Sequence, residues 1–363
     1  MKKLLAILLA MLLVISMAAC AQTAQPSEEK TTDSQTENNA QTAQAPAAEE
    51  QSGEDADASA PQEAHASDTA MASLSGKKIA LLVKSQTNIF WVQICNRAQE
   101  LSDELGFELQ ILAPTTANSN EEQIQLLENS LIDPPDLYII APADSAGIIP
   151  AIEEINEAGV PIVNLNTKIS SDSVDLVSFV SCEQYGLGKL AIQEAIDRLS
   201  DSGSCIFIKG PLGAQTHVDR IEGAKAVLAE NPGWTLLDEQ IGNANRADAL
   251  SITQTLLSKY DKIDFIFAGD AEMGLGAAEA IAQAGRTDEI KVVCINCNEE
   301  VCQAIRDGRI WVSIDDSPAS QVDGAVSVAA LYFNGEAVDA TYYTDIHAVD
   351  LENVETQEKL YIQ

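Results

Sequence analysis

The chain has 363 residues and a formal net charge of −35, with 56 acidic residues against 21 basic ones. A surface this acidic argues against nucleic acid and against any other anionic partner, because like charges repel. About 290 residues follow the N-terminal segments described next, which is enough for two domains of ordinary size.

Residues 1–19 have the features of an export signal. Two lysines follow Met1, and an apolar run continues to residue 19; a basic start, an apolar stretch and small residues before a cleavage site are typical of secreted chains. The sequence Met-Ala-Ala-Cys at residues 17–20 resembles a bacterial lipobox, which implies cleavage before Cys20 and lipidation of its thiol. The alternative is an uncleaved anchor, since the run is only just short of a spanning helix. Both alternatives place the folded part outside the cytoplasm, at a membrane.

Residues 20–75 are predicted to be the lipidated cysteine and a disordered tether. Ala, Gln, Ser, Thr, Asp and Glu dominate this stretch, which carries eleven acidic residues, one lysine and no aromatic residue. Such a composition buries too little apolar surface to offset the entropy lost on ordering. We therefore expect the fold to begin at Gly76.

From residue 76 onward, apolar runs of strand length alternate with helical patterns. The ten predicted strands cover residues 77–83, 108–113, 137–140, 160–165, 176–180, 205–209, 235–241, 265–268, 292–296 and 310–314. Helices are predicted near residues 90–105, 120–131, 148–158, 185–199, 218–230, 247–258, 273–284, 299–307 and 320–333. Repeated βα units imply parallel sheets covered by helices on both faces. Because ten strands are too many for one sheet of this length, we predict an α/β fold of two doubly wound domains.

The loop after the first predicted strand has the chemistry of a ligand site. It contains Asn88, Phe90 and Trp91, and in open α/β sheets ligands bind just past the carboxyl ends of the strands. An amide beside aromatic rings can hold a polyhydroxylated ring through hydrogen bonds and stacking. The alternative is that Phe90 and Trp91 are the first core residues of the following helix.

Four stretches together resemble one protein family. They are Asn-Ile-Phe-Trp at residues 88–91, Pro-Ile-Val-Asn-Leu-Asn at 161–166, Asp-Ala-Glu-Met-Gly-Leu-Gly-Ala at 270–277, and Val-Val-Cys-Ile-Asn at 292–296. In this order and spacing they resemble type I periplasmic binding proteins, the ribose- and galactose-binding kind that serves ABC transporters. The resemblance implies two Rossmann-like lobes joined by a three-strand hinge that closes on a ligand. It implies an N-terminal lobe of residues 76–182 plus 317–342 and a C-terminal lobe of residues 183–316 plus 343–363.

The resemblance also implies a set of ligand-binding side chains, most of them amides and carboxylates at strand ends. They are Asn88, Phe90, Trp91, Asn166, His217, Asp270, Asn296 and Asp316. Carboxylates and amides exchange hydrogen bonds with vicinal hydroxyls, and those to a charged group are the stronger ones. The alternative for the asparagines and Asp270 is a helix cap or turn, and for His217 a surface position on a helix.

Departures from the ribose-type pattern bear on specificity. Asn166 replaces an aspartate that is followed by an arginine, and His217 stands where another arginine is usual. Arg220 lies three positions later and is interpreted as structural. Ala244 replaces the second lobe's aromatic residue, and Lys84 stands where a small polar residue is usual. A site poor in arginine favours an uncharged sugar, polyol or cyclitol over a phosphate or a carboxylate ligand.

Other motifs do not indicate chemistry. Cys294 and Cys297 form a C-x-x-C pair, but no second pair or nearby histidine completes a zinc site, so buried thiols are the preferred interpretation. Which of the six cysteines after Cys20 pair cannot be read from sequence. Asp270 and Asp316 could be cast as the two carboxylates of a glycosidase, but the family resemblance favours a binding protein. We predict no enzyme activity, no cofactor and no metal.

The sequence therefore predicts a bacterial extracytoplasmic lipoprotein, anchored to the cell membrane by its lipid. It would act as a monomer, capture a small neutral sugar or polyol between two lobes, and deliver it to the membrane subunits of an ABC permease. The alternative is a ligand-sensing lipoprotein that signals to a membrane sensor kinase or chemoreceptor. The same binding residues would serve both, so the sequence leaves this choice open.

Overall fold

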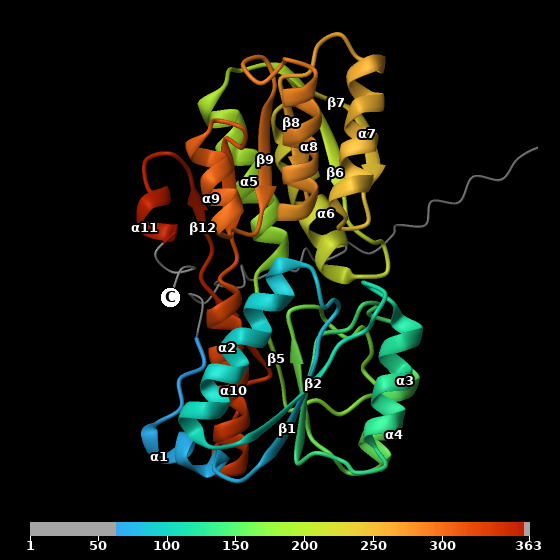
Figure 1. Ribbon diagram of the computed structural model, residues 1–363, viewed down its shortest axis with the longest axis vertical. Helices are drawn as coiled ribbons and strands as arrows, with labels where there is room; N and C mark the ends of the chain where they lie inside the picture. The colour runs from blue at the N-terminus through green and yellow to red at the C-terminus, as the bar shows by residue number, and fades with distance from the viewer. Residues whose placement is uncertain (1–62, 359–363) are drawn as a thin grey trace, which may run out of the picture. The chain divides into compact units, whose positions relative to one another are not determined.

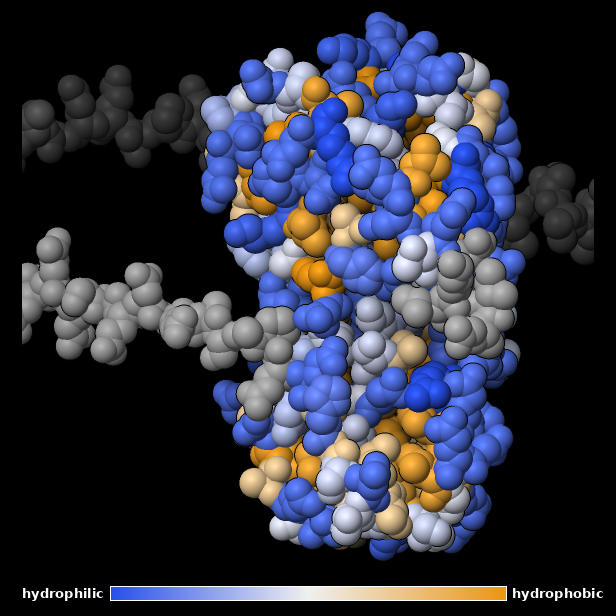
Figure 2. Space-filling view, turned by 90° about the vertical axis from the view of Figure 1, so that its left-hand side faces the viewer, coloured by the Kyte–Doolittle hydropathy of each residue, from blue (hydrophilic) through white to orange (hydrophobic). Residues whose placement is uncertain are grey.

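The computed structural model describes residues 63–358 (Figure 1). The predicted signal at residues 1–19, the lipidation site Cys20 and most of the predicted tether lie outside the described residues. Within the described range, no helix is both long and apolar enough to cross a membrane. Figure 2 shows hydrophilic residues over much of one face of this part of the chain, as its acidic composition leads one to expect.

The first lobe is built on a six-stranded sheet with the strand order β11-β5-β4-β3-β1-β2. All neighbouring strands in it are parallel. The strands are β1 Lys78–Leu82, β2 Glu108–Leu112, β3 Leu137–Ile140, β4 Ile162–Leu165, β5 Ser178–Cys182 and β11 Thr341–Thr344. Its main helices are α2 Ile89–Leu105, α3 Asn120–Ser130, α4 Ile149–Glu157 and α10 Pro318–Phe333.

Helices cover both faces of this sheet, as the side-chain alternation of its strands requires. On β1, Ile79 and Leu81 belong to the core cluster that contains α2 and α10. Ala80 and Leu82 belong to the cluster that contains α3 and α4. Because successive side chains of a strand point to opposite faces, an apolar residue at every position buries both faces of the sheet. The continuous apolar run of the first predicted strand has this physical cause.

The second lobe repeats the arrangement with the strand order β12-β10-β9-β8-β6-β7. Only β12 is antiparallel to its neighbour, β10. Its strands are β6 Gly203–Lys209, β7 Trp234–Ile241, β8 Phe265–Ala268, β9 Lys291–Ile295, β10 Val312–Asp315 and β12 His347–Val349. Its helices are α5 Gln184–Arg198, α6 Gln215–Glu230, α7 Arg246–Lys259, α8 Ala271–Gln283, α9 Glu299–Arg306 and α11 Val354–Glu358.

The prediction of two doubly wound, mainly parallel sheets is confirmed. Each of the ten predicted strands is present, with ends within two residues of the predicted ones. The short strands β11 and β12 were not predicted as strands, because they lack a continuous apolar run and are defined by their pairing with β5 and β10.

The chain passes from one sheet to the other three times. The first two passages follow β5 at Glu183 and β10 at Asp316. The third lies between Thr344, the last residue of β11, and the start of β12. Tyr343, which the family resemblance assigned to the C-terminal lobe, is therefore still part of the first sheet. Ser317, which begins the return into α10, adopts a left-handed backbone conformation with φ of 46°.

The predicted end of the tether at residue 75 is wrong for its last residues. Two short helices, α1 Asp68–Met71 and η1 Ala72–Leu74, precede β1. Ala70 and Leu74 are fully buried in the same core cluster as α10, and the Ser73 hydroxyl donates to the Ala330 carbonyl at 3.1 Å. A few apolar side chains order this stretch by packing on α10. The sequence did not reveal them, because the residues before them are mostly polar and the composition was judged over the whole segment.

Candidate ligand-binding site

A cavity lies where loops at the carboxyl ends of strands from both lobes converge. It encloses about 480 Å³ of space not occupied by protein atoms, part of it open to solvent. Seven of the eight side chains predicted from the sequence line it, namely Asn88, Phe90, Trp91, Asn166, His217, Asp270 and Asn296. The sequence did not single out Lys84, Ser85, Ala117, Asn118, Thr216, Arg220 and Ala244 as ligand contacts, and they also line it. Asp316 lies behind the wall, bonded to Arg220.

Asn88 has a structural role in addition to its place at the cavity. Its side-chain oxygen accepts a hydrogen bond from the backbone N–H of Phe90 at 3.1 Å and so caps the start of α2. The hydroxyl of Ser85 accepts from the backbone N–H of Asn88 at 3.0 Å. These two bonds hold the loop after β1 in place. The Asn88 side chain is therefore supported by a rigid backbone at the cavity.

Phe90 and Trp91 belong to the core of the first lobe and also line the cavity. Their rings meet edge to face, with centroids 4.9 Å apart, and Trp91 is only 6% exposed. Both side chains belong to the cluster that joins β1 to α2 and α10. The two interpretations considered for this pair, ligand contact and helix core, are therefore compatible. An aromatic residue that is anchored in a core offers a ligand a surface whose conformational entropy is already lost.

Asn166 and Asn296 occupy equivalent positions in the two lobes. Each comes directly after a central strand and has a left-handed backbone, with φ of 60° and 71°. The Asn166 carbonyl accepts from the Ser181 hydroxyl at 2.8 Å, and the Asn296 carbonyl accepts from the Ser313 hydroxyl at 2.7 Å. Asparagine adopts this conformation more readily than most residues. Both residues line the cavity, and the Asn166 amide nitrogen also donates to Gln321 Oε1 at 2.9 Å.

Backbone strain is concentrated around the cavity. Six non-glycine residues of the described chain have a positive φ, namely Asn118, Asn166, Asn243, Ala244, Asn296 and Ser317. Four of them line the cavity, and the other two are Asn243, the neighbour of Ala244, and Ser317 in the second passage between the lobes. Such conformations cost of order 1–3 kcal/mol each and are typical of binding sites and moving segments.

Asp270 caps α8 and is buried at the cavity wall. One of its carboxylate oxygens accepts from the backbone N–H of Met273 at 2.8 Å. Burial raises the pKa of Asp270 to about 6, although the Met273 N–H and the charge of Arg220 act in the opposite direction. The carboxylate is therefore ionised at neutral pH and becomes protonated in mildly acidic solution.

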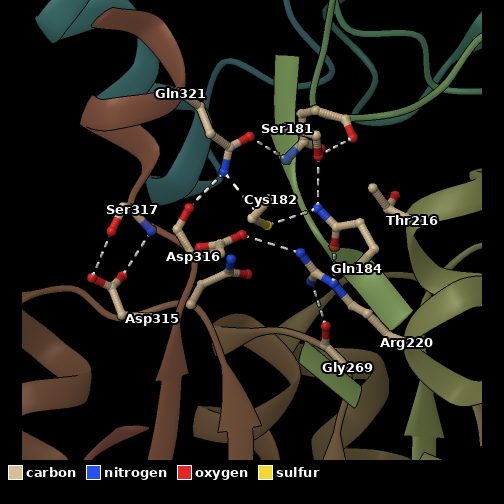
Figure 3. A network of polar contacts seen from close by, with 12 residues as sticks. Ser181, Cys182, Gln184, Thr216, Arg220, Gly269, Asp315, Asp316, Ser317 and Gln321 are labelled. Carbon is tan, nitrogen blue, oxygen red and sulfur yellow. Dashed lines mark hydrogen bonds and ion pairs between the residues drawn. The ribbon is translucent and has the colours of Figure 1, made fainter. Parts of the chain in front are cut away.

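Arg220 connects the cavity wall to the passages between the lobes (Figure 3). Its guanidinium donates to Gln184 Oε1 at 2.7 Å, to the Gly269 carbonyl at 2.8 Å and to Asp316 Oδ2 at 3.1 Å. The residue is 4% exposed and Asp316 is fully buried. The interpretation of Arg220 as structural agrees with these bonds, but it missed that Arg220 lines the cavity. Helix spacing carried the only available signal, since residue 220 lies nearly one turn after His217.

Burial shifts the pKa values of both Asp316 and His217. Burial raises the pKa of Asp316 to about 6, while Arg220 lowers it. Burial lowers the pKa of His217 well below its ordinary value, and the charges of Arg220 and Lys84 add to this effect. His217 is therefore a neutral imidazole, and its Nδ1 is a buried atom without a hydrogen-bond partner among the described residues. It can exchange a hydrogen bond with an uncharged ligand.

Lys84 is the second basic side chain of the cavity. It is 3% exposed, donates to the Thr167 hydroxyl, and holds its ammonium 5.4 Å from the centre of the Trp91 ring. Burial lowers the pKa of Lys84 to about 7, and Arg220 contributes to the shift. The sequence marked Lys84 only as a departure from the family pattern. Its place directly after a strand end was the signal that could have assigned it to the site.

The loops of the two lobes meet beside the cavity. The hydroxyls of Thr167 and Thr216 are 3.1 Å apart, and the backbone N–H of Ser145 donates to the Gly213 carbonyl at 2.9 Å. Gln321 on α10 reaches across the second passage between the lobes, where its amide donates to the Asp316 carbonyl at 2.6 Å (Figure 3). A ligand in the cavity would be enclosed by groups from both lobes.

Metal ligation is not a feature of the described residues. No group of three or more His, Cys, Asp or Glu side chains in residues 63–358 is placed to hold a metal ion. No disulfide joins the described cysteines in this structure, and Cys294 lies fully buried in β9. The arrangement of amides, the Asp270 carboxylate and a neutral imidazole is suited to hydrogen-bonding a polar solute.

The chain is similar to known binding proteins over most of its length. A periplasmic binding protein domain model matches residues 79–337. The ribose import binding protein RbsB of Salmonella typhimurium is 26% identical over 271 residues, which is 75% of this chain and 90% of that protein.

Two solved structures of ABC transporter solute-binding proteins are similar in fold. One, from Actinobacillus succinogenes with bound D-allose, is 25% identical with a TM-score of 0.73, and the match covers 77% of this chain and 99% of that one. Another, from Bacillus halodurans with bound myo-inositol, is also 25% identical with a TM-score of 0.73, and the match covers 79% and 99%. From the match over residues 79–337 we conclude that the chain belongs to the periplasmic binding protein family, a family of extracytoplasmic solute-binding proteins.

Proposed function

We propose that this protein captures a small neutral sugar or polyol between its two lobes and delivers it to an ABC permease. The observation that carries the proposal is the convergence, from both lobes, of the amides of Asn88, Asn166 and Asn296 with the carboxylate of Asp270. These groups accept from and donate to vicinal hydroxyls. The adjacent Trp91 ring supplies an apolar surface for the carbon skeleton of a sugar.

The charges at the cavity support an uncharged ligand. The guanidinium of Arg220 is paired with Asp316 and has three of its donors occupied by protein groups. His217 is neutral, and the low pKa of Lys84 allows its amine to be uncharged near neutral pH. An anionic ligand would need a cation that is not already compensated. The names of the similar proteins give ribose, allose and inositol as their ligands. All three are uncharged and polyhydroxylated.

The N-terminal sequence supports attachment of this binding protein to a membrane. The export signal at residues 1–19 and the lipobox-like sequence before Cys20 are the basis for proposing a lipid-anchored monomer. Two acyl chains at one cysteine are sufficient for a stable anchor. The acidic stretch that follows would hold the lobes within reach of membrane subunits, since charged linkers are extended by self-repulsion.

Ligand binding is tested by thermal unfolding of a chain that lacks residues 1–20. The protein is first unfolded and refolded, which removes any co-purified ligand, and is then heated with pentoses, hexoses, inositols and nucleosides. A ligand at about a thousand times its dissociation constant adds about 4 kcal/mol to the free energy of unfolding. We expect one sugar or polyol to raise the Tm strongly. A folded protein that responds to no member of the panel would contradict the proposed ligand class.

Asp270→Asn is the matched variant for this experiment. Asparagine also caps helices, so the bond to the Met273 N–H can persist while the carboxylate is lost. We expect the empty variant to keep its Tm and to lose most of the ligand-induced shift. Delivery is tested by uptake of the same labelled ligand in cells that carry either form. Uptake that is unchanged in the variant would separate binding from transport and contradict the proposed delivery.

A further inference from the structure

Two cysteines meet at the start of α9, behind the cavity wall. Cys297 directly follows Asn296, and Cys302 lies in the first turns of the helix. Their sulfur atoms are 3.5 Å apart, and neither side chain is more than 1% exposed. The two residues are only five positions apart in the chain, so their contact is determined by the turn that begins the helix.

The turn brings these side chains together for a general reason. Asn298 caps α9, because its side-chain oxygen accepts from the Val301 N–H at 2.9 Å. Cys297 therefore occupies the position before the cap, and Cys302 the fourth position of the helix. Side chains at these two positions pack on each other as a hydrophobic staple. Here the staple consists of two thiols, which can also be joined covalently.

The other described cysteines lie elsewhere in the fold. Cys294 lies on β9 with its sulfur 3.4 Å from the Ser313 hydroxyl. Cys182 lies in the first sheet, 3.1 Å from the Gln184 amide. Cys95 and Cys205 lie on α2 and β6. The structure thus selects one candidate pair from a set of cysteines whose pairing the sequence leaves open.

We propose that Cys297 and Cys302 form a disulfide in the exported protein. The family works outside the cytoplasm, where disulfides form and persist. A disulfide bond of about 2.05 Å requires the two sulfurs to approach by about 1.5 Å. The bond would close a ring over residues 297–302, attach the start of α9 to the end of β9, and stiffen the turn that positions Asn296 at the cavity.

The reaction requires an oxidant, which we assign to the class of extracytoplasmic thiol–disulfide oxidoreductases. One cysteine thiolate attacks the oxidant's disulfide and releases one of its sulfurs, which gives a mixed disulfide. The second cysteine then attacks the sulfur of the first and releases the oxidant as a dithiol. The cysteines lose two protons and two electrons, and the oxidant gains them. The hydrogen bond with the Cys302 thiol, together with burial, raises the pKa of Cys297, so the exchange belongs to folding, when the turn is still open.

Peptide mapping of the full-length chain tests the proposal. The protein is exported with its own signal, extracted without reductant, denatured in N-ethylmaleimide and digested with trypsin. Residues 292–306 form one tryptic peptide that contains Cys294, Cys297 and Cys302. We expect one adduct, on Cys294, and a bond between the other two. Three adducts, both in this sample and in protein refolded with oxidised glutathione, would overturn the proposal, as would a bond that includes Cys294.

Two single variants provide the control. In Cys294→Ser the peptide should carry no adduct and keep the bond, whereas Cys302→Ser should carry two adducts. A short ring still restricts the unfolded chain, so reduction should lower the Tm of the wild type by about 3–6 °C. It should lower the Tm of Cys294→Ser equally and leave that of Cys302→Ser unchanged. A Tm shift that is equal in all three forms would contradict the assigned pair.

Discussion

Replacing Arg220 by methionine tests how the cavity wall is stabilised. The change retains an unbranched side chain but removes the guanidinium, and with it the bonds to Gln184, Gly269 and Asp316. Asp316 is fully buried, so its carboxylate would lose its cationic partner where bulk solvent does not reach it. Breaking a buried ion pair by removing one member costs about 3–5 kcal/mol. We therefore expect Arg220→Met to lower the free energy of unfolding by about this amount near neutral pH.

The loss should depend on pH in a direction that the structure fixes. The pKa of folded Asp316 is raised to about 6 from its ordinary value of 3.8, so the folded state binds a proton more tightly than the unfolded state. The stability that this proton contributes is fully present below the unfolded pKa and is lost as the pH rises through the folded pKa. Without Arg220 that pKa rises further. At about pH 5 Asp316 is protonated and the variant should lose clearly less stability than at about pH 7.5.

Urea unfolding of four proteins measures this coupling. They are the wild type, Arg220→Met, Asp316→Asn and the double variant, each at about pH 5 and about pH 7.5. Because the two residues touch, their effects should not add. At the higher pH, Asp316→Asn should recover most of the stability lost in Arg220→Met. An equal loss at both pH values, with no recovery in the double variant, would refute the assigned ion pair.

Three further predictions concern Lys84, Trp91 and the N-terminal helices. Burial lowers the pKa of Lys84 to about 7, so its ammonium is lost as the pH rises through this value. An ammonium donates stronger hydrogen bonds to ligand hydroxyls than a neutral amine does. Calorimetry should therefore show ligand affinity falling from about pH 7 to about pH 8.5, above the range in which Asp270 titrates. Lys84→Met should remove this dependence, and an unchanged dependence would exclude Lys84 from the site. Trp91→Ala should lower the free energy of unfolding of the empty protein by about 3–5 kcal/mol, and Trp91→Phe by less. A loss in urea unfolding of below about 1 kcal/mol would show that Trp91 is not part of the core. A chain that begins at Gly76 lacks the fully buried Leu74 and should lose at least about 2 kcal/mol relative to one that begins at residue 63. Equal Tm values for these two chains would contradict the packing of the two short helices on α10.

The sequence was sufficient to predict the architecture of this protein. Apolar runs of strand length alternate with amphipathic helical patterns, and this local signal does not depend on distant contacts. The sequence also placed the ligand-binding site at the carboxyl ends of the strands, because parallel strands bring these ends to one edge of the sheet. Asn88 and Asp270 illustrate the limit of such reasoning, since a helix cap and a cavity wall were treated as alternatives and the structure combines them.

Only the tertiary structure decided how charges and neighbouring side chains meet. Arg220 and Asp316 are 96 positions apart, and their pairing follows from the way α6 and the second passage between the lobes pack together. The pKa shifts of Lys84 and His217 arise from burial, which no local pattern measures. The contact between Cys297 and Cys302 needed the turn that begins α9. Sequence periodicity records which face of an element is buried, whereas the electrostatics of a site depend on distances that exist only after the elements have packed.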